Sequence, residues 1–313
     1  MTHSLRLLMA ISLAALPHRG ASPFAYDRHA PLRVADSLWK QQDGVEIRAI
    51  RFDSPKGGRV TGLLFLPGNG GRHPGILLGH GAPGDSRSER AVEMGVALAR
   101  AGTVVLAIDA PFARRGDAPV TFTPSDSADQ VQLVIDSRRG LDLLVARPDI
   151  DPSRLGYVGT SYGGAQGALL VGVEPRLRAA VLRVADGGFI AHFSDPCDPA
   201  AQAGATIRGC LIWTLPEGGP SEAERERWAA AMRPIEPIEY IGRARARILF
   251  QSGRQDASVL PVRAARLHQA APAGSVVEWY DSGHRLPAEA TASALSFLAR
   301  ALGTLAPAAA SSR

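Results

Sequence analysis

The chain has 313 residues, of which 45% are hydrophobic and 21% are charged, and its formal net charge is +5. This balance is that of an ordinary globular protein, which excludes a disordered chain, a collagen-like repeat and a disulfide-stapled scaffold as descriptions of the whole. The basic residues are scattered, with no Lys/Arg-rich run and no aromatic residues interleaved among them, which argues against a nucleic-acid-binding protein.

The N-terminal segment has the pattern of an export signal. Arg6 and the free amine precede a short apolar stretch, Leu7–Leu16, which Pro17 ends. The stretch is too short to span a bilayer, and no later apolar run reaches the roughly 20 residues of a transmembrane helix. We therefore predict that residues 1–21 are a signal peptide or disordered leader of a periplasmic or secreted protein without stable membrane insertion. A cytoplasmic protein with a frayed N-terminus is the alternative.

The middle of the chain alternates strand and helix patterns. Two β-rich runs, Val45–Phe52 and Val60–Leu66, are joined by turn residues at 53–58 and predict an antiparallel hairpin. Six short apolar runs follow, each leading toward a helical segment, and they are typical of central strands buried on both faces. They are Gly75–Gly79, Thr103–Asp109, Leu155–Gly159, Ala179–Val184, Ile248–Ser252 and Val276–Tyr280.

Segments with the helical spacing of apolar residues separate these runs. They are Ser88–Arg100, Gln130–Ala146, Pro261–Ala271 and Ala288–Leu302. A further helix, rich in small residues, is expected at Ala165–Val173. This alternation predicts an α/β fold, with a mostly parallel central sheet, helices on both faces and the antiparallel hairpin at its N-terminal side. We expect a single domain over residues 22–302 and a disordered tail at residues 303–313.

One segment, residues 186–242, is too long to be a simple connection between strands. It contains aromatic residues and a charged helical segment at Ser221–Met232. Long insertions between core strands typically form a lid or a wall of a binding site, so we expect a cap-like insertion here, with a surface decoration over the sheet edge as the alternative. Cys197 and Cys210 lie in this insertion and would form a disulfide in an exported protein or two buried thiols in a cytoplasmic one.

The run Gly159–Gly163, with the sequence GTSYG, is a G-x-S-x-G motif between an apolar strand and a small-residue helix. In this context the motif predicts a nucleophile elbow, where a sharp turn holds Ser161 in a strained conformation at the end of the sheet. A Gly-rich phosphate loop is the alternative, but the G-x-x-x-x-G-K-[ST] pattern is absent. We therefore interpret Ser161 as a catalytic nucleophile.

A serine hydroxyl becomes a good nucleophile when a base takes its proton, and one histidine is well placed to do so. His284 follows the last predicted strand, at the edge where ligands bind in open α/β sheets. The imidazole in turn needs an orienting carboxylate. Asp256, just after the strand Ile248–Ser252, is our candidate, and Asp281 is its rival. The chain order Ser161, Asp256, His284 is one of the known orders of a catalytic triad.

An oxyanion hole needs backbone N–H donors beside the nucleophile. The usual donors are the residue after the serine and one residue in the loop after the first central strand. These positions indicate Tyr162 and Ala82, since Pro83 has no N–H group. His80, in the same loop, is interpreted as a residue that braces the loop by hydrogen bonding.

The aromatic residues of the insertion should partly belong to the core and partly line the acyl or alcohol pocket. The pocket candidates are Phe189, Trp213 and Trp228. No H-E-x-x-H, His-x-His or carboxylate cluster points to a catalytic metal, and no G-x-G-x-x-G opens a helix after the first strand. We therefore expect neither a metal nor a nicotinamide or flavin cofactor.

Together these residues resemble the α/β-hydrolases of the dienelactone-hydrolase and acetyl-xylan-esterase-like branch. The matching stretches are Asp43–Pro67, His80-Gly81, Arg147–Arg154, the Ser161 motif, Pro234–Ile241, Gly253–Asp256 and Gly283-His284. The resemblance covers about residues 40–302 and implies a triad of Ser161, Asp256 and His284, with Tyr162 and Ala82 as oxyanion donors. Dienelactone hydrolases use a cysteine nucleophile, so the serine at position 161 favours a carboxylic-ester hydrolase.

The predicted function is that of a serine esterase that forms an acyl-enzyme and acts on a small-molecule or carbohydrate-linked ester. A serine peptidase is the first alternative, because the region around Ser161 also resembles prolyl-oligopeptidase catalytic domains, although the chain lacks the length for their β-propeller. The second alternative is a hydrolase-fold protein that binds its ligand without catalysis, and the intact Ser, His and Asp set speaks against it.

Overall fold

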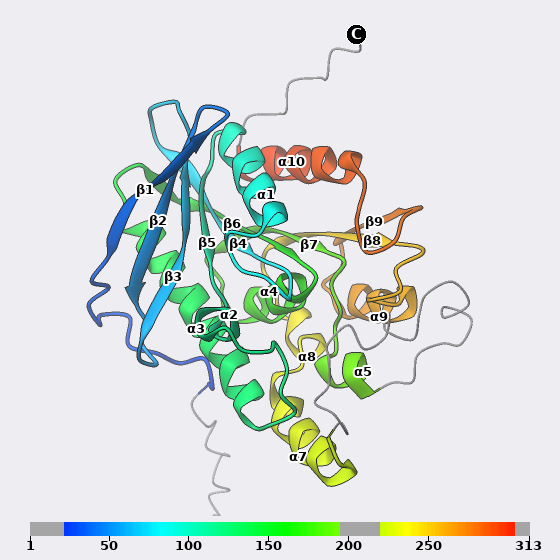
Figure 1. Cartoon of the computed structure of the whole chain (residues 1–313). Coiled ribbons are helices and arrows are strands. Elements are labelled where there is room, and N and C mark those ends of the chain that lie inside the picture. Colours follow the sequence, from blue (N-terminus) through cyan, green and yellow to red (C-terminus); the bar gives the residue numbers. More distant parts are fainter. Residues whose placement is uncertain (1–21, 195–219, 304–313) are drawn as a thin grey trace, which may run out of the picture.

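The computed structural model of the protein describes residues 22–194 and 220–303 (Figure 1). The predicted signal segment, Cys197, Cys210, Trp213 and residues 304–313 lie outside the described residues. The described part is built around a nine-stranded sheet with the strand order β1-β2-β3-β5-β4-β6-β7-β8-β9. Most of this sheet is parallel, as predicted, and helices lie on both of its faces.

The N-terminal strands are antiparallel. β2 (Val45–Asp53) and β3 (Arg59–Leu66) form the predicted hairpin, and β3 also pairs antiparallel with β5 (Val104–Ile108). β1 (Ala35–Gln42) pairs with the outer side of β2, and the sequence did not predict it. Its side chains are mostly exposed, so it lacks the apolar alternation that indicates a strand packed on a core.

The remaining strands continue the sheet in parallel from β5. They are β4 (His73–Gly79), β6 (Ile150–Thr160), β7 (Leu177–Arg183), β8 (Arg247–Gly253) and β9 (Val276–Tyr280). The prediction of burial on both faces is confirmed for β4, β5, β7 and β8. It is wrong for β9, whose side chains are exposed or half-buried because β9 is the last strand of the sheet.

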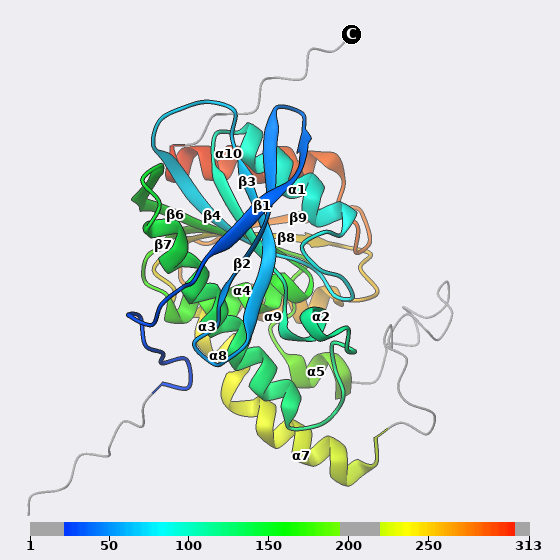
Figure 2. The ribbon, with the colours of Figure 1, turned by 60° about the vertical axis from the view of Figure 1, so that its left-hand side comes forward.

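Two hydrophobic cores lie on opposite faces of the sheet. Each lies under helices that Figures 1 and 2 show on either side of the strands. One contains side chains of α1 (Glu89–Arg100) and α10 (Ala288–Leu302). The other contains side chains of α3 (Ser125–Val145), α4 (Tyr162–Val173) and α9 (Pro261–Ala270). Successive strand residues alternate between the two cores, as the strand period of two requires.

The helix boundaries agree with the sequence patterns to within a residue for α1, α9 and α10. α3 begins at Ser125, five residues before the predicted start, because its first turn is polar and carries no apolar periodicity. Asp126 in this first turn is buried and accepts hydrogen bonds from the backbone N–H groups of Thr121 and Phe122. The start of the helix is therefore held by a buried carboxylate, which the apolar pattern did not indicate.

The described parts of the insertion pack against the α3 side of the sheet. They contain α5 (Phe189–Ser194), α7 (Glu222–Met232), the 3-10 turn η2 (Arg233–Ile235) and α8 (Ile238–Ile241). α7 begins with a capping box, in which Ser221 and Glu224 each accept a hydrogen bond from the other's backbone N–H. A short further helix, α2 (Pro111–Arg115), follows β5.

Two of the predicted pocket residues are core residues. Trp228 is 1% exposed, packs against the rings of Phe122 and Phe193, and donates from Nε1 to Asp126 Oδ2 at 2.8 Å. Phe189 is 7% exposed and belongs to the same hydrophobic core. Trp228 thus attaches the insertion to the first turn of α3, and neither Trp228 nor Phe189 is among the residues that line the pocket beside Ser161 described below. Trp213 lies outside the described residues.

Within residues 22–194 and 220–303, we find no helix with both the length and the apolar character that crossing a membrane requires.

Candidate active site

Ser161 occupies a sharp turn between β6 and α4. Its backbone φ of 57° and ψ of −118° lie in a region that residues other than glycine rarely adopt. The two motif glycines permit the turn: a Cβ at Gly159 would collide with the backbone of Gly163, and a Cβ at Gly163 would collide with the carbonyl of Gly79. The turn is also held by Ser161 N–H, which donates to the carbonyl of Arg183 at 2.8 Å. The motif spacing therefore follows from steric demands of this turn.

The structure brings Ser161, His284 and Asp256 together. His284 Nε2 lies 2.9 Å from Ser161 Oγ, and His284 Nδ1 lies 2.8 Å from Asp256 Oδ2. A carboxylate only accepts hydrogen bonds, so Nδ1–H donates to Asp256 and Nε2 accepts from the Ser161 hydroxyl when the imidazole is neutral. The three residues follow β6, β8 and β9, which are parallel, so they meet at one edge of the sheet.

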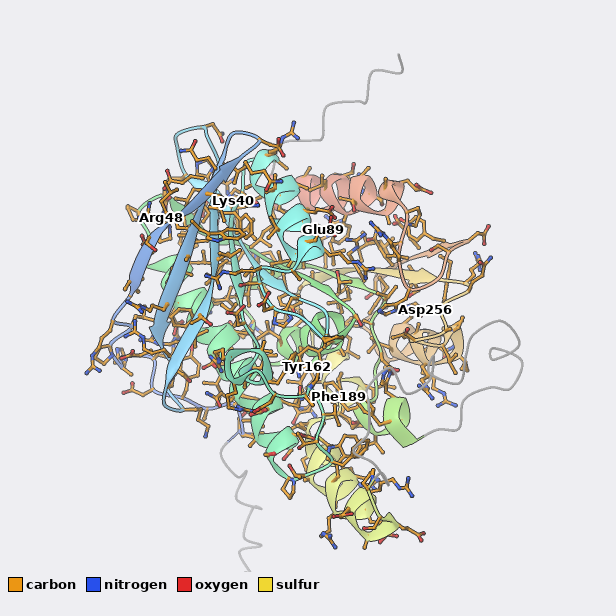
Figure 3. The ribbon with its side chains drawn as sticks, in the orientation of Figure 1. Lys40, Arg48, Glu89, Tyr162, Phe189 and Asp256 are labelled. Carbon is orange, nitrogen blue, oxygen red and sulfur yellow. The ribbon has the colours of Figure 1, made fainter. Side chains whose placement is uncertain are left out.

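Asp256, rather than Asp281, faces the imidazole. Asp256 is 3% exposed, and its Oδ1 accepts from the backbone N–H groups two and three residues further along the chain, at 2.8 and 2.9 Å. These bonds fix the carboxylate and leave Oδ2 for His284. The Asp281 side chain is 83% exposed and lies 3.2 Å from Nε of Arg254. Figure 3 marks Asp256 in the loop between β8 and α9.

The loop after β4 runs alongside the nucleophile. A Cβ at Gly81 would lie 3.7 Å from Ser161 Cβ, so this part of the loop contacts the elbow closely. Ala82, the first predicted oxyanion donor, follows directly. Tyr162, the second, is the first residue of α4, where backbone N–H groups have no partner within the helix and the helix dipole is positive (Figure 3). Both predicted donors therefore flank Ser161.

His80 braces this loop, as predicted. Ala110 N–H donates to His80 Nε2 at 3.0 Å, so Nδ1 carries the proton and donates to the carbonyl of Gly81 at 2.8 Å. The ring is buried, and this burial lowers the pKa of His80. A neutral imidazole with both nitrogens engaged positions the loop and is not a second base.

Tyr157 is a positioning residue that the sequence analysis missed. Its hydroxyl donates to the carbonyl of Gly163 at 2.5 Å, which holds the first turn of α4 against β6. The side chain is buried, and burial raises the pKa of Tyr157, so it stays a donor. A tyrosine within the apolar run Leu155–Gly159, four residues before Ser161, was the available signal.

A pocket of about 340 Å³ opens beside Ser161. The loop Gly81–Pro83, Met94 of α1 and the imidazole of His284 contribute to its lining. It has the size of a site for a small acyl or alcohol group. Among the described residues, no three His, Cys, Asp or Glu side chains are grouped in a way that could hold a metal ion.

Titratable groups from both described parts of the insertion form a second cluster. Asp186 Oδ2 lies 2.9 Å from Nδ1 of His192, and Glu236 Oε1 accepts from the backbone N–H of Ile190 at 3.1 Å. Burial, together with the negative charge of Asp186, raises the pKa of Glu236 to about 7. Glu236 therefore holds a proton more tightly in the folded protein than in the unfolded chain.

This shift predicts a loss of stability as pH rises toward neutrality. Between the ordinary glutamate value and about pH 7 the folded state binds the extra proton, so the free energy of unfolding is greatest on the acidic side and falls as pH rises through the folded pKa. Thermal melts of wild type and Glu236→Gln from about pH 5 to about pH 8 should show a smaller decline in the variant. Glu239→Gln, an exposed neighbour on α8, is the matched control. Equal declines in wild type and Glu236→Gln would contradict the prediction.

Comparison with curated proteins identifies distant relatives. No protein-family model matches the chain. Two uncharacterised proteins of Mycobacterium tuberculosis, from strains CDC 1551 and H37Rv, are each 30% identical to it over 182 residues. The match covers 57% of this chain and 61% of each relative, so it spans less than two thirds of the relatives' length.

Solved structures define the fold. An acetyl xylan esterase from a Paenibacillus species matches with a TM-score of 0.67 at 20% identity, over 87% of this chain and 90% of that one. An acetyl xylan esterase from a Thermoanaerobacterium species matches with a TM-score of 0.69 at 19% identity, over 89% of this chain and 90% of that one. A puromycin-hydrolysing peptidase of Mycobacterium tuberculosis matches with a TM-score of 0.62 at 18% identity, over 82% of this chain and 39% of that one. The protein therefore has the α/β-hydrolase fold, and the predicted fold class is confirmed.

Proposed function

We propose that the protein is a serine hydrolase that cleaves carboxylic esters, with Ser161 as nucleophile, His284 as base and Asp256 as the carboxylate that orients His284. The observation that carries the proposal is the hydrogen-bonded chain from Asp256 through His284 to Ser161, on a strained turn beside a pocket. A nucleophile in reach of a base, with the base oriented by a third group, is the arrangement that nucleophilic catalysis requires.

In the first half-reaction, an ester carbonyl enters the pocket beside Ser161. His284 Nε2 takes the hydroxyl proton as Ser161 Oγ attacks the carbonyl carbon. The negative charge that develops on the carbonyl oxygen is stabilised by the backbone N–H groups of Ala82 and Tyr162. The imidazolium then gives its proton to the leaving alcohol, and the acyl group remains on Ser161. Asp256 stays ionised and stabilises the imidazolium.

Water completes the cycle. His284 removes a proton from a water molecule, which attacks the acyl-enzyme and forms a second tetrahedral intermediate. The oxyanion of this intermediate accepts hydrogen bonds from the same two backbone N–H groups. Collapse of this intermediate returns the proton to Ser161 and releases the carboxylic acid. Both half-reactions need the imidazole of His284 in its neutral form.

Ester cleavage is favoured over peptide cleavage by the two acetyl xylan esterase structures, which match about nine tenths of this chain and of their own length. A serine peptidase is the second candidate, because the puromycin-hydrolysing peptidase also matches 82% of this chain. The two candidates differ in the leaving group, which is an alcohol in one and an amine in the other. The proposed substrate is a small ester or an ester on a carbohydrate.

The test compares esters and amides with the same acyl group. The protein should hydrolyse para-nitrophenyl acetate much faster than para-nitroacetanilide, and acetylated xylan tests the carbohydrate-linked case. A fluorophosphonate probe should label wild type and the control Ser153→Ala, whose serine is exposed, but not Ser161→Ala. Preferential cleavage of the anilide would favour the peptidase. Folded wild-type protein that resists the probe and cleaves neither substrate would favour a binding protein without catalysis.

A further inference from the structure

Arg183 is a buried arginine with an unused donor next to the candidate active site. It ends β7 opposite Thr160 of β6, its carbonyl accepts from the N–H of Ser161, and it is 9% exposed. Its Nη2 lies 3.3 Å from the hydroxyl of Thr291 on α10, while its Nε is buried with no hydrogen-bond partner. Among the residues that the structure describes, no carboxylate forms an ion pair with it.

This burial is costly for a group that is always charged in water. A buried cation without a paired anion loses its hydration and regains little in return. Burial accordingly lowers the pKa of Arg183 to about 10. Groups with strongly shifted pKa values cluster at functional sites, and an anion that binds beside such a cation restores part of the lost interaction.

The Glu278 carboxylate, two strands away from Arg183 in the sheet, is committed to other partners. Gln251 lies opposite Arg183 in the register of β7 and β8, and its side-chain nitrogen donates to Glu278 at 3.0 Å. Glu278 also accepts from the hydroxyls of Ser293, at 2.6 Å, and Tyr280. This network occupies the Glu278 carboxylate, which forms no ion pair with the Arg183 guanidinium.

Arg183 lines a pocket of about 760 Å³ between α1 and α10. Two further arginines, Arg90 and Arg285, line it and are exposed, against a single carboxylate from Glu93. The pocket is therefore net positive. It shares His284, together with part of α1 and Thr160, with the pocket beside Ser161. A molecule whose carbonyl lies at Ser161 can therefore extend toward Arg183.

We propose that Arg183 binds a carboxylate of the substrate, so that the preferred substrates are esters whose acyl or alcohol part carries a carboxylate. This inference rests on the proposed function. The planar guanidinium fork of Arg183 lines the pocket, and its geometry matches the charge-assisted hydrogen bonds that a carboxylate accepts. Thr291, from the other side, fixes the orientation of the fork. Arg183 is thus a specificity residue at a distance from the reacting carbonyl.

Matched substrate pairs test the inference. One pair places the carboxylate on the alcohol side, para-acetoxybenzoate against its methyl ester. The other places it on the acyl side, mono-para-nitrophenyl glutarate against its methyl ester. Wild type should prefer the carboxylate member of at least one pair in kcat/KM, and Arg183→Met should lower that preference by about tenfold or more. Arg225→Met, on α7 at the far end of the molecule from α10 (Figures 1 and 2), removes the same charge and should retain the preference.

Thermal melts separate binding from a structural role. Removing a buried cation that has no anion partner should leave the melting temperature of Arg183→Met equal to or above that of wild type. A purely structural arginine would instead leave the substrate preference unchanged and lower the melting temperature. Thr291→Val retains the charge of Arg183 but removes the hydroxyl that positions its guanidinium, so it should also lower the substrate preference. This variant replaces Arg183→Met in the test if Arg183→Met does not fold. A folded Arg183 variant with unchanged preference would overturn the inference.

A binding measurement distinguishes this inference from the proposed function. Monomethyl glutarate should bind Ser161→Ala, measured by calorimetry, and should bind the double variant Ser161→Ala/Arg183→Met at least about tenfold more weakly. Binding that depends on Arg183 in a protein that hydrolyses no ester would contradict the proposed function and support a carboxylate site. Ester hydrolysis with binding that ignores Arg183 would support the function and overturn the site.

Discussion

Ser161→Ala and His284→Ala are each expected to lower kcat for ester hydrolysis by about 10⁴- to 10⁶-fold while the protein remains folded. Ser161 Oγ and His284 Nε2 lie 2.9 Å apart and act as one unit, since the hydroxyl needs the imidazole to accept its proton. The double variant should therefore be about as slow as either single variant, because removing one member already disables the other.

The measurement is steady-state hydrolysis of para-nitrophenyl acetate, with circular dichroism to establish that each variant is folded. Ser153→Ala and His29→Ala, both at exposed positions, are the matched controls and should stay close to wild type. Losses of less than about tenfold in a folded Ser161→Ala protein would mean that another group performs the chemistry.

Asp256→Asn is expected to lower kcat by about 10⁴-fold, by analogy with the same substitution in a serine protease triad. The carboxylate accepts from His284 Nδ1–H at 2.8 Å, which leaves Nε2 free to accept the Ser161 proton. An amide nitrogen in its place would favour the opposite tautomer, with the proton on Nε2. The imidazole could then no longer act as the base.

Asp281→Asn is the matched control for this substitution, because it removes the same charge at an exposed position that pairs with Arg254. It should change kcat by less than about twofold. The reverse result, with Asp281→Asn inactive and Asp256→Asn near wild type, would assign the orienting role to Asp281. Thermal melts of both variants show whether a loss of activity reflects unfolding, since Asp256 also accepts two backbone N–H groups.

The central fold was predictable because its strands are buried on both sides and are almost wholly apolar. Strand β4 and its neighbours stand out against polar loops for this reason. β1 was not predicted, because this exposed edge strand has no apolar face and therefore no alternation of apolar and polar residues. The early start of α3 was also missed, since it depends on the side chain of Asp126. This carboxylate accepts from the nearby backbone of Thr121 and Phe122 and from the indole of Trp228, which is distant in the sequence.

The positions of Ser161, Asp256 and His284 were predictable because each follows a recognisable strand, and the ends of parallel strands meet at one edge. The surroundings of the aromatic residues proposed for the pocket were not predictable. An aromatic residue in an insertion gives the same sequence signal whether it lies in a core or in a pocket. The Trp228 indole donates to Asp126, which is 102 residues away in the sequence, so the sequence pattern does not indicate this contact. Arg183 was missed for a related reason. Whether a carboxylate lies close enough to pair with an arginine depends on distances in the folded chain, which the sequence does not give.

The central claim, an acyl-enzyme on Ser161, is tested most directly by trapping that intermediate. The protein is mixed with para-nitrophenyl butyrate, quenched in acid during turnover and analysed by intact-mass and peptide mass spectrometry. We expect a mass increase of one butyryl group on the peptide that contains Ser161, and none in Ser161→Ala. Acylation of a different residue during turnover, or a burst of nitrophenol that Ser161→Ala retains, would contradict the account.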